Sequence, residues 1–425
     1  MEIIAIIAEY NPFHLGHARQ IAAARRFFGQ DCPVIVAMSG SFTQRGEPAL
    51  LDKWTRTRIA LSSGADLVFE LPFISATASA QGFARGGVRL LQATGLRARL
   101  VFGSESGQLE DLDKLAVFLA DESDDFRLAL RQGLEDGLSF AAARQQAAAA
   151  CLETPELAAL LSQSNNILAV EYLMALQPLS PRRLQPWTNP REGQSYRESS
   201  WQNDQQASAS AIRAIVRRLR DQDNLSPARA VTLLRQQMPA ATLAEILQAW
   251  QKGPGPLFQE DFAVPIISLL RRADEPSIDQ VPGMAEGLGR RLLEAARRPG
   301  TDAGGRLETL CRDAATRRFP RTRINRALLS LLSGTTKEDL EQAGRNQKPP
   351  YLRVLGFSRQ GRYLLRMMRK TAECPIILNA SDFLEHQQDP FLSRMAALDI
   401  RSTDLWFLQA GERCGRDFDT PPIMR

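Results

Sequence analysis

The chain has 425 residues, of which 44% are hydrophobic and 24% charged, and it carries a formal net charge of +5 with a pI near 9.1. These values are ordinary for a soluble chain of two or three domains that buries a core. The sequence has no run of eighteen apolar residues, no signal-peptide pattern and no CxxC pair among its five cysteines, so we expect a cytoplasmic protein without a membrane partner, disulfide framework or zinc site.

The first 105 residues alternate the signals of strands and helices. Short apolar runs predict strands at residues 2–8, 33–38, 66–71 and 99–102. Periodic stretches with start and stop signals predict helices at residues 16–28, 52–63 and 79–93. This alternation predicts an α/β fold, with a parallel sheet and helices on both faces. Because ligands bind at the carboxyl ends of strands in such sheets, we expect the loops 9–16, 39–48 and 103–105 to open on one edge.

The rest of the chain has mainly helical patterns. Residues 108–176 are helical in periodicity, and a short strand is predicted near Leu184 to Thr188, followed by a polar loop. A helix starts at Ser208, the stretch 225–350 is mostly helical, and the last 75 residues suggest a smaller mixed unit. We therefore predict three domains, at residues 1–220, 221–350 and 351–425.

Two of the three histidines lie directly after the first predicted strand, in the string His14-Leu15-Gly16-His17. A helix N-terminus presents unpaired N–H groups and the positive end of a dipole, so it is an anion site, and Gly16 would let a phosphate approach the backbone. Histidines three residues apart can face one side of that turn and donate to phosphate oxygens. Two incidental histidines at a helix cap are an alternative, whereas zinc is disfavoured by the lack of further ligands.

Longer strings resemble a known family. HxGH after a first strand is similar to the nucleotidyltransferase superfamily of class I aminoacyl-tRNA synthetases and adenylyltransferases. The strings AEYNPFHLGH, MSGSFTQRGEPALLDKWTRTRIALSSGADLVFELPF, VFGSE and SNNILAVEYLMAL closely resemble the bacterial tRNA(Met) cytidine acetate ligase family. SASAIR, EGLGRRLLEAA, RTRINRALL and RVLGFSRQGR extend the likeness to about residue 370. The resemblance implies a Rossmann-like nucleotidyltransferase domain at residues 1–220, followed by a mainly helical, tRNA-binding region at 221–350.

The resemblance implies an ATP-dependent ligase. Such an enzyme would activate acetate as acetyl-adenylate, release pyrophosphate, and pass the acetyl group to N4 of the wobble cytidine of elongator tRNA(Met), forming N4-acetylcytidine. Acetate needs no general base, because its pKa lies near that of side-chain carboxyls, about 4, and it is ionised at pH 7. ATP, acetate and elongator tRNA(Met) are the expected substrates, and Mg²⁺ is expected to accompany ATP.

The likeness also implies which residues bind ATP. His14 and His17 would be the catalytic pair on the phosphates, with Ser208 and Ser210 of SASAIR on the β- and γ-phosphates. The full implied ATP site is Ile7, Ala8, Glu9, Tyr10, Asn11, Pro12, Phe13, His14, Leu15, Gly16, His17, Ala18, Arg19, Gln20, Gly103, Asn165, Asn166, Arg191, Ser208 and Ser210. The family's usual Tyr-His-Asp reads Tyr196-Arg197-Glu198 here, and the cation at the phosphates could be Arg19, Arg45 or Lys53.

Two further segments have both a functional and a plain interpretation. With the resemblance, Ser39, Gly40, Gln44 and Arg45 are expected to line the acetate or cytidine site; without it, they read as ordinary Gly/Pro turns. The arginine cluster, defined as Arg317, Arg318, Arg321, Arg323 and Arg326, is expected to contact the tRNA backbone, although a solvated helix face would look the same. Trp54 and Arg56 are interpreted as packing and surface residues.

Two other functions fit parts of the pattern. A small-molecule adenylyltransferase could use the first 105 residues, but it would not need the long arginine-rich remainder. A non-catalytic tRNA- or ribosome-binding protein could retain the fold, but His14, Gly16 and His17 are all present. The sequence leaves the oligomeric state open.

Overall fold

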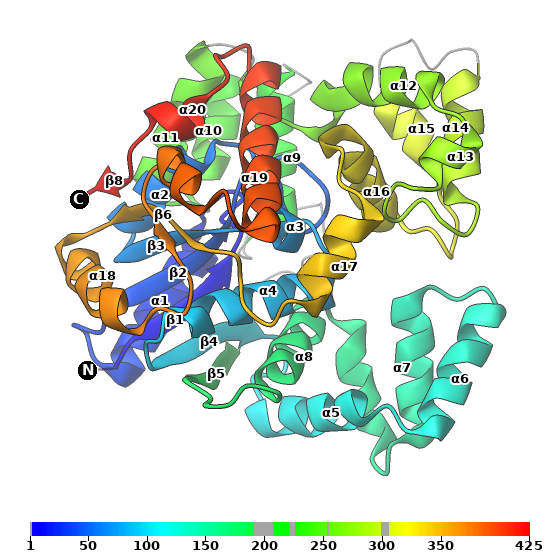
Figure 1. Ribbon diagram of the computed structural model, residues 1–425, viewed down its shortest axis with the longest axis horizontal. Coiled ribbons are helices and arrows are strands. Elements are labelled where there is room, and N and C mark those ends of the chain that lie inside the picture. Colours follow the sequence, from blue (N-terminus) through cyan, green and yellow to red (C-terminus); the bar gives the residue numbers. More distant parts are fainter. Residues whose placement is uncertain (1, 191–206, 222–225, 253–254, 299–305) are drawn as a thin grey trace.

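A mostly parallel sheet forms the centre of the molecule (Figure 1). The computed structural model describes residues 2–190, 207–221, 226–252, 255–298 and 306–425. The strand order is β5-β4-β1-β2-β3-β6-β7, and β8 also pairs with β6. The strands are β1 (Ile4–Ala8), β2 (Val34–Ser39), β3 (Leu67–Leu71), β4 (Ala98–Ser104), β5 (Leu184–Pro190), β6 (Leu352–Phe357), β7 (Ile376–Ile377) and β8 (Ile423–Met424).

The predicted α/β fold is confirmed. Strands β5, β4, β1, β2 and β3 are parallel to one another, so their carboxyl ends lie on one edge. Strand β1 lies between β2 and β4, which makes it the point at which the strand order reverses. Ligands of open α/β sheets bind in the crevice outside the carboxyl ends at such a switch point. The loop after β1 is therefore the expected centre of a site.

The apolar strands are buried on both faces, as parallel strands usually are. Alternate residues of β1 enter different cores: Ala5 packs in one with α4 (Ala80–Ala93) and α8 (Ser164–Leu176), while Ile4 and Ile6 pack in the other. That second core includes residues of α1 (Leu15–Phe28), α2 (Lys53–Ser62) and α9 (Ala209–Arg220). Because successive side chains of a strand point to opposite faces, the sheet packs between two layers of helices.

Two groups of helices stand on the same side of the sheet in Figure 1. One group follows β4 and comprises α5 (Leu109–Asp121), α6 (Asp124–Glu135), α7 (Phe140–Cys151), η1 (Pro155–Ser162) and α8. The other comprises η2 (Gln259–Phe262), α12 (Ala263–Arg272), α13 (Glu275–Ile278), α14 (Leu288–Arg297), α15 (Arg306–Ala314), α16 (Arg321–Ser333) and α17 (Lys337–Arg345). Helices α10 (Pro227–Arg235) and α11 (Ala240–Lys252) pack beside α9 in the second core. The expected helical remainder is confirmed.

The last 75 residues share the central sheet. Strand β6 pairs antiparallel with β3. The helices that follow β6 are α18 (Arg359–Thr371), η3 (Ala380–His386), α19 (Pro390–Gln409) and α20 (Arg416–Asp419), and α19 contacts α3 (Phe73–Ala76), which follows β3. A buried ion cluster reinforces this junction: Lys53 donates to Glu70 of β3 and to Asp417 of α20, each at 2.8 Å. The three-domain division remains a prediction, but its first and third parts have a common sheet.

None of the helices in the described ranges is long and apolar enough to cross a membrane.

Candidate active site at the carboxyl edge of the sheet

The first turn of α1 is capped by two histidines. His14 is the N-cap residue, and its Nδ1 accepts a hydrogen bond from the Gly16 N–H at 3.0 Å. In return, His17 Nδ1 accepts from the His14 N–H at 3.2 Å, so the two residues form a reciprocal capping box. The ring centroids are 3.9 Å apart. The sequence placed both histidines on one side of this turn, and the structure brings them together.

These hydrogen bonds set the protonation of both rings. Because each Nδ1 accepts from a backbone N–H, the neutral imidazole carries its proton on Nε2. Each ring is thus a neutral Nε2–H donor beside a helix N-terminus. This combination can stabilise negative charge on phosphate oxygens without bringing a proton acceptor to the reaction.

The turn before α1 is held rigidly. Tyr10 has φ of 48°, in the left-handed region that non-glycine residues rarely occupy. Its ring is buried and makes edge contacts with Phe13 at 4.8 Å and His17 at 5.0 Å between centroids. Burial raises the pKa of Tyr10 well above its usual range, so the phenol stays protonated.

Buried polar atoms gather at this edge of the sheet. Several buried side-chain atoms of the described residues lack a hydrogen-bond partner, and five of them belong to the ends of β1, β2 and β5 or to the first turn of α9. They are Tyr10 Oη, Asn11 Nδ2, Ser39 Oγ, Asn189 Oδ1 and Ser210 Oγ. Native proteins pair nearly all their buried polar atoms, so such a group indicates a ligand-binding edge.

Arg56 connects the ends of β1 and β2 through hydrogen bonds to backbone carbonyls. Its guanidinium is buried and donates to the carbonyls of Glu9 at 2.8 Å, Ser39 at 2.9 Å and Leu51 at 3.0 Å, and to that of Gly40. Burial lowers the pKa of Arg56 to about 10. The interpretation of Arg56 as a surface residue is wrong, because α2 is buried on almost every side. On such a helix, the spacing of residues in the sequence does not show which charged side chains point inward.

The loop after β2 folds back onto β1 and onto α16. The Gln44 N–H donates to the Glu9 carboxylate at 2.8 Å, and burial raises the pKa of that carboxyl. Gly46 packs directly against α16: a Cβ there would lie 2.5 Å from the backbone nitrogen of Arg326. The Arg326 guanidinium donates to the Gln44 carbonyl at 3.5 Å, and burial lowers the pKa of Arg326 to about 10.

Helix α9 begins at the same edge. Ser208 caps it by accepting from the Ala211 N–H at 3.1 Å, and Gln237 accepts from both Ala207 and Leu15, which places the starts of α9 and α1 together. From α9, Arg213 forms an ion pair with Glu47 at 2.9 Å. The SASAIR segment therefore contacts both the loop after β1 and the loop after β2.

The loop after β4 is held by the start of α8. The Asn166 side chain is buried; its Oδ1 accepts from the N–H groups of Glu105 at 2.9 Å and Ser106 at 3.2 Å. The Glu105 carboxylate in turn accepts from the Asn165 side chain at 2.7 Å and from the Asn166 N–H at 2.7 Å. Asn166 thus positions the loop that follows Gly103. Arg191 and Tyr196-Arg197-Glu198 lie outside the described residues.

One of the three expected cations is excluded. Lys53 is fully buried and its ammonium is held by Glu70, Asp417 and Thr403, so it does not supply charge to a phosphate. Arg45 is half-buried in the loop after β2, and Arg19 is exposed on α1. These two arginines remain the expected cations.

The arginine cluster is less cationic than its sequence suggests. Arg318 and Arg323 share one carboxylate, that of Glu286, at 3.2 and 3.0 Å. Arg321 pairs with Glu308 at 2.8 Å. Arg317 is exposed and, within the described residues, has no carboxylate within 4.0 Å. Acidic residues outside the cluster thus neutralise part of it.

The described residues contain no cluster of three or more His, Cys, Asp or Glu side chains that could hold a metal ion.

Comparison with known proteins gives consistent results. A model of the family described as HIGH Nucleotidyl Transferase matches residues 1–418. The chain is 36% identical over 426 residues to the tRNA(Met) cytidine acetate ligase of Acetivibrio thermocellus, covering 98% of each chain. It is also 36% identical to the protein of that name in Syntrophomonas wolfei, covering 100% of this chain and 99% of the relative.

Two solved structures resemble the whole chain. Thermotoga maritima TmcAL in its apo form superposes with a TM-score of 0.90 at 32% identity. The same protein bound with alpha-thio ATP superposes with a TM-score of 0.88 at 32% identity. Both comparisons cover 100% of this chain and 99% of the other chain.

Proposed function

The chain belongs to the tRNA(Met) cytidine acetate ligases within the HIGH nucleotidyltransferase family, and we propose that it acetylates N4 of the wobble cytidine of elongator tRNA(Met). It is an ATP-dependent ligase that uses acetate. The two half-reactions are formation of acetyl-adenylate from acetate and ATP, and transfer of the acetyl group to the tRNA. A cytoplasmic location follows from the tRNA substrate.

In the first step, a carboxylate oxygen of acetate attacks the α-phosphorus of ATP. A new P–O bond forms, the bond to the β-phosphate oxygen breaks, and pyrophosphate leaves with the electron pair. The Nε2–H groups of His14 and His17, together with the N-terminus of α1, stabilise the charge that grows on the phosphoryl oxygens. Because acetate is already an anion, the step needs positioning rather than a base.

In the second step, the N4 amine of cytidine attacks the carbonyl carbon of acetyl-adenylate. The C–N bond forms, AMP leaves with the electrons of the C–O bond, and the amine loses one proton. We place acetate and the cytosine beside Ser39, Gly40, Gln44 and Arg45, between the ends of β1 and β2. The support is the unpaired Oγ of Ser39 and the anchoring of this loop to Glu9 and α16.

The nucleotide is assigned to the other side of β1. Residues 7–20 would surround the phosphates, Gly103 would lie against the nucleotide, and Ser208 and Ser210 would bind the β- and γ-phosphates with Arg191. The proximity of the α1 and α9 N-termini supports this assignment, because both dipoles favour anions. Asn165 and Asn166 would act through the loop that they hold. Magnesium would accompany the phosphates, and the arginine cluster would contact the tRNA.

The observation that supports the proposal is the reciprocal cap of His14 and His17, which puts two neutral Nε2–H donors at one helix N-terminus. The adenylation step is tested alone by exchange of labelled pyrophosphate into ATP in the absence of RNA. Exchange that depends on acetate, and not on a longer carboxylate such as butyrate, is expected. Exchange without any carboxylate would instead indicate a different adenylyl acceptor.

A further inference from the structure

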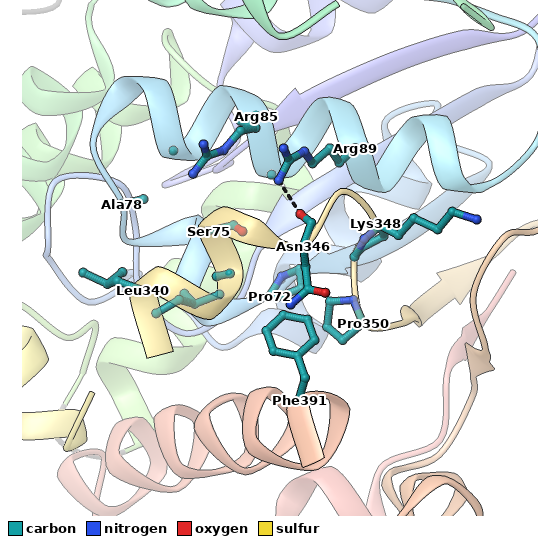
Figure 2. A pocket seen from close by; sticks show the side chains of 15 residues that line it. Pro72, Ser75, Ala78, Arg85, Arg89, Leu340, Asn346, Lys348, Pro350 and Phe391 are labelled. Atoms are coloured by element: carbon teal, nitrogen blue, oxygen red, sulfur yellow. Dashed lines mark hydrogen bonds between the residues drawn. The ribbon is translucent and has the colours of Figure 1, made fainter. Parts of the chain in front are cut away.

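A pocket away from the histidine site lies between α4 and α17. Its walls include Pro72, the N-cap residue of α3, Ser75 of α3, Arg85 and Arg89 of α4, Leu340 of α17 and Phe391 of α19. Figure 2 shows that Arg85 and Arg89 project from one face of α4 toward α17, whereas the Lys348 side chain extends away from them. The pocket thus has two guanidinium groups on one wall, and its other walls combine apolar side chains such as Leu340 and Phe391 with the polar residues Ser75, Asn346 and Lys348.

Among the described residues, the hydrogen-bond partners of Arg89 are uncharged. Arg89 donates to the Asn346 carbonyl at 2.6 Å and to the Gln347 amide oxygen at 3.0 Å, which are uncharged acceptors. In the described part of the chain, no carboxylate lies within 4.0 Å of Arg85 or Arg89. Burial, and then the charge of Arg85, lower the pKa of Arg89 to about 10. Like charges four residues apart destabilise a helix, and a bound anion would remove this repulsion.

The packing of α4 keeps the pair in place. Gly86 lies between the two arginines in sequence and against Ser75, where a Cβ would stand 2.4 Å from the Ser75 Cβ. A glycine inside a helix is less favourable than an alanine would be. The close approach of α4 to residue 75 therefore sets the arginines over the pocket.

We propose that this pocket binds a backbone phosphate of the tRNA, with Arg85 and Arg89 on the phosphate and the sugar against Leu340 and Phe391. Arginine pairs suit phosphate because their planar donors match its oxygens, and RNA is a polyanion with apolar sugar and base faces. The proposal rests on the proposed function, since its occupant is the tRNA substrate. The pocket is next to the active edge, because α3 begins directly after β3 ends. A tRNA with its cytidine at that edge could extend across it.

The test compares Arg85→Gln with Arg131→Gln, which removes the same charge from an exposed position on α6. The readout is the Kd for elongator tRNA(Met) across a salt series. Arg85→Gln should weaken binding about fivefold or more and reduce the slope of log Kd against log salt by about 0.7 to 0.9. Arg131→Gln should change neither, and Arg85→Lys should restore the slope because it restores the charge.

Three outcomes separate this proposal from the function itself. Equal tRNA binding and salt slope in wild type, Arg85→Gln and Arg131→Gln would overturn the pocket proposal, even when wild type acetylates tRNA. Equal weakening in both glutamine variants would also overturn it, because a general charge effect would then explain the loss. Failure of acetate-dependent pyrophosphate exchange in the wild type would contradict the proposed function, whatever the tRNA binding shows.

Discussion

Gly46 and Arg326 are in backbone contact, although 280 residues separate them: a Cβ on Gly46 would lie 2.5 Å from the Arg326 nitrogen. This contact docks the loop after β2 onto α16, the helix that carries part of the arginine cluster. The same loop reaches the Glu9 carboxylate through the Gln44 N–H. The expected acetate site and the expected tRNA-binding helix are therefore joined by one loop.

Replacing Gly46 with alanine should displace this loop. Gly46 has φ of 71° and no room for a Cβ, whereas Gly137 has φ of 80° and no atom within 4 Å of the place that a Cβ would take. Gly137→Ala should therefore cost about 1 to 2 kcal/mol for the left-handed conformation alone. Gly46→Ala should lower the free energy of unfolding, measured with urea, by more than Gly137→Ala does. It should also raise the KM for acetate. Equal losses of stability in the two variants, with an unchanged KM, would contradict the docking role.

Replacing His14 with asparagine should separate capping from catalysis. Asparagine is a favourable N-cap residue, so it can replace the bond to the Gly16 N–H, but it does not reproduce the Nε2–H donor. We expect a melting temperature close to that of wild type and pyrophosphate exchange lowered by about 10² to 10³. His14→Ala should lose the exchange and also about 0.5 to 2 kcal/mol of stability. Wild-type exchange in His14→Asn would show that the ring is only a cap.

Replacing Lys53 with methionine should strongly destabilise the fold. The change leaves the buried carboxylates of Glu70 and Asp417 without the ammonium that both contact at 2.8 Å. Breaking a buried ion pair in this way costs about 3 to 5 kcal/mol. Arg58→Met, on the same helix, breaks a pair with Glu245 in which the Arg58 side chain is 46% exposed, and should cost at most about 1 kcal/mol. Similar midpoints of urea unfolding for the two variants would argue against the buried cluster as a major contributor.

The arginine cluster should contribute to tRNA binding unevenly. Arg317 is exposed and, among the described residues, has no nearby carboxylate, while Arg321 is paired with Glu308. Arg317→Gln should therefore reduce the slope of log Kd for tRNA against log salt by about 0.7 to 0.9, and Arg321→Gln should reduce it by less. Filter binding across a salt series measures both. If neither variant changes the slope, the tRNA surface lies elsewhere on the molecule.

Local patterns in the sequence predicted much of the fold and the proximity of His14 and His17. The strands and helices of the first 105 residues are marked by continuous apolar runs and by stop signals such as Gly64. The helix predicted from Gly16 begins at Leu15, with His14 as its N-cap residue. The pairing of β6 with β3 was not predictable in this way, because no local sequence pattern shows which distant strand pairs with β3 in the sheet.

The charged residues were the least predictable part. Arg56 and Lys53 lie on a helix that is buried on nearly every side, so helical spacing did not show that both point inward. The acids that neutralise the arginine cluster, Glu286 and Glu308, come from outside the cluster and meet it only in the fold. The Arg85–Arg89 pocket likewise depends on α17, about 250 residues later in the chain.

The central claim is tested most directly by incubating the protein with ATP, labelled acetate and an elongator tRNA(Met) transcript, beside a transcript whose wobble cytidine is replaced by uridine. Label is expected only on the cytidine transcript, with one AMP and one pyrophosphate released per acetyl group and no labelling when acetyl-CoA replaces acetate and ATP. Label on both transcripts, or pyrophosphate release with neither transcript labelled, would contradict it.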